Sequence, residues 1–303
     1  MKKKNAVILG MLAAVLVLAA AFTVMITNNT EEKNDDDNFT VVTSFYPMYV
    51  AAANVIGDTK GVTLENLSEP QTGCLHDYQL TTADMKLLSK ADIFIVNGGG
   101  IESFLSDVAK SYPKLTIIEA SENVSLLSEG TEENAHAWMS IADYRIQLST
   151  IEAALEKADQ DHQNEYHENA MAYDKKLAEL EEKQDEIREA AAGQNVILFH
   201  EAYDYVAEDY GLHVSYVLDL DEERQVSAGE AAEVLDAIKN DHVSYIFAEE
   251  LYGSDMGKTM EEESDVKVIY LDTCNRGDYS KDSYLTAMQS NIDKLYEAFC
   301  TQE

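Results

Sequence analysis

The chain has 303 residues, of which 46% are hydrophobic and 9% aromatic, enough to form a folded core of one or two domains. Its 57 acidic residues against 22 Lys and Arg give a formal net charge of -35. This charge argues against nucleic acid and anionic membrane surfaces as partners, because both repel a negatively charged surface. The acidic surface favours solubility, and its field can also speed the capture of cations.

Residues 1–29 have the features of a targeting segment. Lys2, Lys3 and Lys4 precede an uncharged apolar run at 6–26, and an acidic linker follows at 30–38. At about 1.5 Å per residue, a helix over this run is long enough to cross the roughly 30 Å hydrocarbon core of a bilayer. We predict an uncleaved membrane anchor, with a signal peptide cleaved near 19–21 as the alternative. In both cases the lysines stay inside and the rest of the chain is exported.

Beyond residue 38, short β-branched runs alternate with helical stretches, which is typical of βαβ units around parallel sheets. Two such series predict an N-terminal α/β lobe at 39–160 and a C-terminal α/β lobe at 193–303. The first series has predicted strands at 40–43, 62–67, 92–96 and 115–119, with helices near 48–56, 82–89 and 101–111. The second has predicted strands at 195–199, 214–218, 244–248 and 267–271, with helices near 201–209, 228–240, 255–264 and 283–299.

The segment between the two series is poor in strand formers and rich in Ala, Glu, Lys, Leu and Gln, which favour helices. Over 162–192 its apolar residues recur three, four or seven apart, so one stripe can pack against both lobes. No Pro-rich or Gly/Ser-rich linker separates the halves. We therefore predict two Rossmann-like lobes with parallel sheets, joined at 161–192 by a long rigid helix.

Four potential metal ligands follow predicted strands. His200 and Asp272 come directly after strands of the second lobe, and His76 and His136 lie in loops after strands of the first. Ligands bind at the carboxyl ends of parallel strands, because the loops there converge. If the two lobes face each other, three imidazoles and one carboxylate meet in the cleft, which suits the tetrahedral preference of Zn²⁺.

Each of these residues also has an ordinary explanation, since a loop histidine is commonly a surface residue and an Asp after a strand is commonly a helix cap. The other four of the seven histidines are weaker candidates. His162 and His167 lie five residues apart on the charged linker helix, off a common face, and we expect them to be exposed. His213 and His242 precede strands, at the opposite end of the sheet.

The candidate ligands lie within local motifs. In chain order these are GCLHDYQLT at 73–81, NAHAWMS at 134–140, LFHEAYDY at 198–205, IFAEE at 246–250 and YLDT at 270–273. Together and in this order they resemble the motifs of the metal-specific substrate-binding proteins of ABC importers for zinc and manganese. The resemblance covers nearly all of residues 40–299.

This resemblance implies two α/β lobes joined by a long helix, with the metal held in the cleft by the four candidate ligands. The departures are local. Leu75 and Ala135 replace the prolines that usually precede the first two ligands, and the acidic segment 121–133, whose role stays open, replaces the His-rich loop of many zinc receptors. Manganese receptors often carry an acid at the third ligand position, so His200 favours zinc, and manganese is the alternative cargo.

The three cysteines matter because disulfides persist outside the cytoplasm, and an odd number leaves at least one unpaired or paired with another chain. Cys74 lies two residues before His76, and Cys274 two residues after Asp272, so the two thiols come together if these loops share a metal. A Cys74–Cys274 disulfide is the favoured hypothesis. The alternatives are a Cys274–Cys300 disulfide and a thiolate that replaces an oxygen ligand.

Ligating groups usually have a hydrogen-bond partner behind them. Glu249, at the end of its predicted strand, is a candidate for this role, with a surface carboxylate as the alternative. We expect Trp138 and Tyr78 to wall the site, although core packing alone explains both.

These observations predict an extracytoplasmic receptor subunit that captures Zn²⁺, with Mn²⁺ as the alternative, and presents it to an ABC permease and its ATPase. We expect a monomer, anchored to the outer face of the membrane by residues 6–26 or secreted after cleavage. No chemical conversion is expected, because a catalytic zinc site leaves a position open for water and the chain has no H-E-x-x-H motif. A secreted zinc hydrolase and a metal-dependent surface adhesin are the alternatives.

Overall fold

The computed structural model describes residues 38–301, apart from 77, 130–131 and 221–223. The predicted targeting segment at 1–29 and the acidic linker up to residue 37 lie outside this range. Within the described part of the chain, none of the helices is both long enough and apolar enough to cross a membrane.

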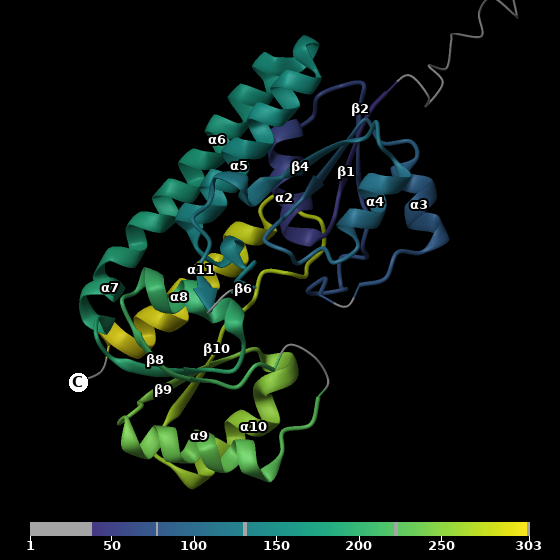
Figure 1. Ribbon diagram of the computed structural model, residues 1–303. Helices are drawn as coiled ribbons and strands as arrows, with labels where there is room; N and C mark the ends of the chain where they lie inside the picture. The colour runs from purple at the N-terminus through teal and green to yellow at the C-terminus, as the bar shows by residue number, and fades with distance from the viewer. Residues whose placement is uncertain (1–37, 77, 130–131, 221–223, 302–303) are drawn as a thin grey trace, which may run out of the picture. The chain divides into compact units, whose positions relative to one another are not determined.

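The first sheet has four parallel strands in the order β2-β1-β3-β4. All four residues of β3 are buried, as expected for a central strand covered on both faces. Figure 1 shows α3 and α4 on one side of this sheet, and the helix pair α5 and α6 on the other. The elements are β1 (Phe39–Thr43), α2 (Tyr46–Ile56), β2 (Val62–Asn66), α3 (Thr82–Leu88), β3 (Ile93–Val96), α4 (Leu105–Ser111) and β4 (Thr116–Glu119).

The second sheet is also parallel, in the order β10-β9-β7-β8. Alternate residues of its central strands serve two cores: Ile197 packs with α9 and α10, whereas Val196 and Leu198 join the core shared with the first sheet. Figure 1 shows α9 and α10 beneath this sheet. The elements are β7 (Asn195–Leu198), α8 (Asp204–Asp209), β8 (His213–Val217), α9 (Ala228–Asn240), β9 (Tyr245–Ala248), α10 (Glu250–Glu263), β10 (Lys267–Tyr270) and α11 (Ser283–Cys300).

A continuous helical stretch joins the two sheets, and α5 packs against its first part. The predicted apolar stripe is confirmed, because Tyr166, Tyr173 and Leu177 of α6 are all buried. Arg145 of α5 forms ion pairs with Asp174 at 2.6 Å and with a second carboxylate of α6. The elements are α5 (Ile141–Ala158), α6 (Gln163–Glu181), the 3-10 turn η5 (Glu182–Gln184) and α7 (Asp185–Ala191).

The predicted fold class is confirmed, and every predicted strand is present with its ends within one residue of the expected position. The start of α10 differs, since the helix begins at Glu250 and not near 255. This helix packs so closely on the sheet that two of its positions require glycine. A Cβ at Gly253 would lie 2.9 Å from Ala248 Cβ, and one at Gly257 would lie 2.5 Å from the Tyr270 hydroxyl.

Residues from Phe39 onward form one unit, so the lobe boundaries drawn from the sequence stay a prediction. Helix α11 returns from the second sheet to the first half of the chain. Its Tyr284 stacks on Tyr144 of α5, with ring centroids 3.8 Å apart, and donates a hydrogen bond to the Trp138 carbonyl at 2.7 Å. Trp138 Nε1 in turn donates to the Thr273 carbonyl at 2.9 Å. These buried contacts fix the loops at the carboxyl ends of the two sheets against each other.

Candidate metal centre

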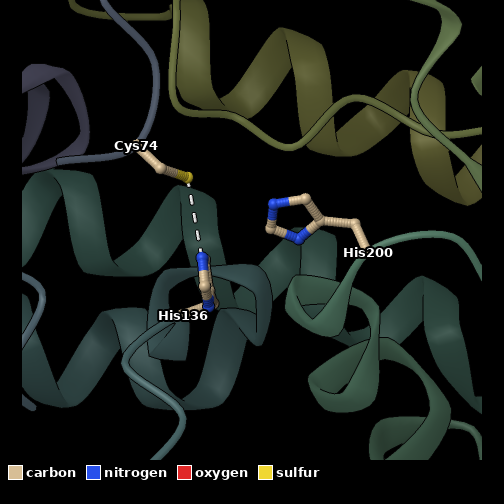
Figure 2. A group of neighbouring side chains, drawn as sticks. All are labelled: Cys74, His136 and His200. Carbon is tan, nitrogen blue, oxygen red and sulfur yellow. Dashed lines mark hydrogen bonds between the residues drawn. The ribbon is translucent and has the colours of Figure 1, made fainter. Parts of the chain in front are cut away.

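Three potential ligands from separate loops converge between the two sheets. Cys74 Sγ lies 3.6 Å from His136 Nε2, and donor atoms of Cys74, His136 and His200 all lie within 4.8 Å of one another. Both imidazoles are buried and Cys74 is half-buried. Figure 2 shows the three side chains pointing toward one another. This inner group combines nitrogen and sulfur donors, which Zn²⁺ accepts.

A second, outer group shares His136 with the first. His76 Nε2 lies 3.7 Å from Glu201 Oε1, and the same oxygen lies 3.5 Å from His136 Nδ1. The side chains of His76 and Glu201 are 36% and 39% exposed, so this group faces solvent. The His76 and His136 rings are 5.4 Å apart between centroids.

A groove of about 960 Å³ opens beside the outer group. Its lining includes His76 and four carboxylates, from Glu133, Glu201, Asp204 and Glu208. Carboxylates gathered in a groove concentrate cations near it. The groove therefore leads cations toward His76 and Glu201.

His136 is held so that one ring nitrogen keeps its lone pair. The Asn134 amide oxygen accepts hydrogen bonds from His136 Nδ1 at 2.9 Å and from the His136 backbone N–H at 3.1 Å. With Nδ1 protonated, the lone pair of Nε2 faces Cys74. Burial and the neighbouring His200 and His76 lower the pKa of His136 well below its usual value, so the ring is neutral and ready to bind a cation.

The loop before His136 is fixed from the first sheet. Asn97, directly after β3, donates from its amide to the Ala135 carbonyl at 2.8 Å. Glu102 holds this end of β3 by accepting from the Asn97 backbone N–H at 2.7 Å and from Ser44 Oγ at 2.8 Å. Burial raises the pKa of Glu102 to about 7. These contacts give His136 a rigid base on the sheet.

His200 follows β7 and caps the turn that leads into α8. Its Nδ1 accepts the Ala202 backbone N–H at 2.9 Å, and the other ring nitrogen faces Cys74 and His136 (Figure 2). A neutral imidazole that binds a metal through one nitrogen carries its proton on the other. Metal binding at the nitrogen that faces the group therefore ends the hydrogen bond from Ala202.

Asp272 follows β10, as predicted, but it is exposed. Its Oδ1 accepts the Cys274 backbone N–H at 2.7 Å. Among the described residues, Asp272 is a member of neither donor group. Its role as a metal ligand stays a prediction.

Glu249, predicted to support a ligand, lies at the end of β9 and accepts from Arg276 Nη1 at 2.6 Å. Both side chains of this ion pair are largely buried, at 13% and 18% exposure. Burial raises the pKa of Glu249, while Arg276 acts in the opposite direction. Its ion-pair partner is thus a guanidinium, not a histidine.

All three cysteines lie in the described part of the chain, and none of them forms a disulfide. The predicted Cys74–Cys274 disulfide is therefore wrong, as is its Cys274–Cys300 alternative. The turn after Asp272 directs Asn275 to Cys74, with Asn275 Nδ2 donating to Cys74 Sγ at 3.1 Å. The Cys274 thiol is buried and donates instead to the Asp272 carbonyl, at 3.7 Å. Burial raises the pKa of Cys274, which keeps it a thiol.

Of the two aromatic residues expected at the site, Trp138 is beside it. The Trp138 ring is fully buried, with its centroid 5.0 Å from that of His136. Tyr78 instead packs against Phe104 at 5.8 Å and donates to Asp84 at 3.1 Å.

The remaining histidines lie elsewhere. His213, the first residue of β8, and His242, which precedes β9, are both exposed. His167 is exposed as predicted, whereas His162 is half-buried against Asp159. His167 also forms a third group with two carboxylates of α5, Glu152 and Glu156, which sequence reasoning missed because the contact joins two helices.

Glu201 was also missed, although it directly follows His200 in the third motif. Two adjacent residues usually point in different directions when they lie in a strand. Here the chain leaves β7 and enters a 3-10 turn at Glu201–Tyr203, so both side chains lie near His136, His200 in the inner group and Glu201 in the outer one. In the sequence, the predicted end of the strand just before His200 was the signal that could have indicated Glu201.

Residues 41–298 match the model of a protein family described as zinc-uptake complex component A, periplasmic. The chain belongs to this family. The high-affinity zinc uptake system protein ZnuA of Bacillus subtilis is 26% identical over 280 residues, which cover 85% of this chain and 86% of that protein. The manganese-binding lipoprotein MntA of Halalkalibacterium halodurans is 26% identical over 261 residues, with 84% and 86% covered.

The solved structures agree. The substrate-binding protein FpvC of Pseudomonas aeruginosa, in complex with Mn²⁺, matches with a TM-score of 0.77 and 28% identity. The match covers 86% of this chain and 98% of FpvC. The resemblance to metal receptors of ABC importers, stated from the sequence motifs, is thus confirmed at the level of the zinc-uptake component A family.

Proposed function

We propose that the chain is the extracytoplasmic substrate-binding subunit of an ABC importer, which captures a divalent transition metal and delivers it to a permease. The position of His136 between His76 and His200 carries this proposal, since the ring centroids of these two residues lie 5.4 Å and 5.0 Å from that of His136. All three follow carboxyl ends of strands, where α/β proteins bind their ligands. Membership of the zinc-uptake component A family supports it.

Zinc is the proposed cargo. Imidazole nitrogen suits Zn²⁺, whereas Mn²⁺ prefers carboxylate and other oxygen ligands. Manganese is the second candidate, because relatives named for manganese share the fold. Asp272 is the fourth ligand proposed from the sequence.

The geometry suggests a route for capture. The acidic groove concentrates the cation, and the exposed pair His76 and Glu201 meets it before the buried group of Cys74, His136 and His200. The loops that carry these residues are tied together by buried hydrogen bonds such as Trp138 to Thr273. We therefore propose that the receptor presents the metal on a rigid frame, and that release at the permease requires strain on the loops or displacement of ligands.

We propose no catalytic activity for the chain, because the four ligands proposed from the sequence would fill the tetrahedral shell of a zinc ion and leave no position open for a substrate water. The proposed partners are a permease and its ATPase. The proposed form is a monomer on the extracytoplasmic face, held by residues 6–26 or secreted after cleavage.

Calorimetric titration of the purified, metal-free chain with Zn²⁺ tests this function. We expect one tight site per chain, which is lost or greatly weakened in His136→Ala and His200→Ala. His213→Ala is the matched control, since His213 is exposed at the start of β8 and should leave the affinity unchanged. Unchanged affinity in both His136→Ala and His200→Ala would overturn the proposal.

A further inference from the structure

We propose that Cys74 supplies a sulfur ligand to the transported metal, so that the inner site is a cysteine-histidine set that favours zinc over manganese. The proposal rests on the function proposed above and specifies the chemistry of the same site. In this set the sulfur of Cys74 takes the place of the carboxylate oxygen that the sequence assigned to Asp272.

The position of Cys74 fits coordination. In tetrahedral zinc sites the metal lies about 2.3 Å from sulfur and about 2.0–2.1 Å from an imidazole nitrogen, so these two donors are about 3.6 Å apart. Cys74 Sγ and His136 Nε2 are 3.6 Å apart. The third donor, from His200, lies within 4.8 Å of both. The three atoms thus surround a point that a zinc ion can occupy (Figure 2).

The surroundings of the sulfur fix its position. Asn275 Nδ2 donates a hydrogen bond to Cys74 Sγ at 3.1 Å. Asn275 is buried, and its own amide oxygen accepts from Thr273 Oγ1 at 3.0 Å, which fixes the direction of the donor. A hydrogen bond from a neighbouring donor orients a ligand toward its metal.

The loop that carries Cys74 is held from the other half of the molecule. Gly73 has a φ of +87°, and a Cβ at this position would lie 2.3 Å from Arg276 Nη2. A residue without a side chain is therefore required for Arg276 to pass so close to the loop. Gln71 Nε2 also donates to the Gly277 carbonyl at 2.7 Å. These contacts keep the Cys74 loop against the turn that provides Asn275.

A sulfur ligand has a direct consequence for selectivity. Thiolate is a soft ligand that zinc accepts readily, whereas manganese favours oxygen. Removal of the sulfur should therefore weaken zinc binding more than manganese binding. His76 lies on the exposed side of His136, with the two ring centroids 5.4 Å apart, and is the proposed source of a third nitrogen.

X-ray absorption of the zinc-loaded full-length chain tests the proposal. We expect one sulfur at about 2.3 Å in the wild type, with nitrogen or oxygen at about 2.0–2.1 Å. The sulfur should disappear in Cys74→Ser and remain in the control Cys300→Ser, whose thiol lies at the end of α11. Competition titration should show that Cys74→Ser lowers zinc affinity by more than about 10-fold and changes manganese affinity by much less.

The outcomes separate this proposal from the function on which it rests. A wild-type zinc spectrum that contains only nitrogen and oxygen overturns the role of Cys74 and leaves the receptor function standing. A wild-type chain that binds no zinc overturns the receptor function itself. If Cys74→Ser does not fold, the cobalt-substituted wild type decides, because a sulfur ligand gives a sulfur-to-metal charge-transfer band and its absence contradicts the proposal.

Discussion

Replacement of Asn134 should separate the orientation of His136 from its ability to bind metal. The buried Asn134 side chain makes two contacts as acceptor, with His136 Nδ1 at 2.9 Å and the His136 N–H at 3.1 Å. It makes two as donor, to the Glu201 carbonyl at 2.9 Å and to Asp204 Oδ2 at 3.2 Å. Asn134→Ala removes all of them and leaves the tautomer of His136 undetermined.

The expected effects follow from these contacts. At a net value of about 1 kcal/mol per hydrogen bond, Asn134→Ala should lower the free energy of unfolding of the metal-free protein by about 3–4 kcal/mol. Loss of the group that orients a ligating histidine commonly lowers metal affinity by about 10–100-fold. This corresponds to about 1.4–2.8 kcal/mol of binding free energy.

Asn134→Asp is the matched variant. It keeps an oxygen for His136 Nδ1 and the backbone N–H but loses both donors, and it places a carboxylate beside Asp204. We expect a similar loss of stability, while zinc affinity stays close to that of the wild type, because the tautomer of His136 is preserved.

Urea unfolding of the metal-free proteins measures the stabilities, and zinc titration against a competing chelator measures the affinities. The reasoning is refuted if Asn134→Ala keeps the wild-type affinity, or if Asn134→Asp loses as much affinity as Asn134→Ala.

Three further predictions use other contacts of the site. Trp138, the single tryptophan of the chain, has its ring 5.0 Å from that of His136, so zinc binding should change its fluorescence; an unchanged emission spectrum on saturation would contradict the placement of the metal. Arg276→Met leaves Glu249 buried without its partner and should cost about 3 kcal/mol in urea unfolding, part of which the double variant with Glu249→Gln should restore. Full stability of the single variant would argue against the pair. The metal-free protein should also lose stability as the pH falls below about 6.5. Below this pH His136 binds a proton in the unfolded state, whereas in the folded state its lowered pKa keeps it neutral, so the lower pH favours unfolding. His136→Gln should flatten this loss in melting curves between about pH 5 and 7.5, and equal slopes in both proteins would contradict the assignment.

The sequence was sufficient for the two sheets, since periodic β-branched runs predict each strand directly. It also indicated that His136 and His200 lie close together, and their ring centroids are 5.0 Å apart, because residues at the carboxyl ends of parallel strands converge. The apolar stripe of α6 followed from its helical spacing.

The features that could not be predicted depend on the direction of side chains in turns. Cys274 was expected to face Cys74, but its φ of 54° turns the chain so that the next residue, Asn275, makes the contact. The ion pair of Glu249 with Arg276 joins residues 27 positions apart, with α10 and β10 between them, and has no local signal in the sequence. Spacing along the chain locates such residues near a site and does not decide which atom reaches it.

The central claim is that one divalent metal binds between the two sheets through His76, His136 and His200. An anomalous difference map at the zinc absorption edge, from crystals of the zinc-loaded chain, tests it most directly. We predict one strong peak at about 2.0–2.1 Å from a nitrogen of each of these three histidines. A map with no peak there, or with its main peak at Glu152, Glu156 and His167, would contradict the account.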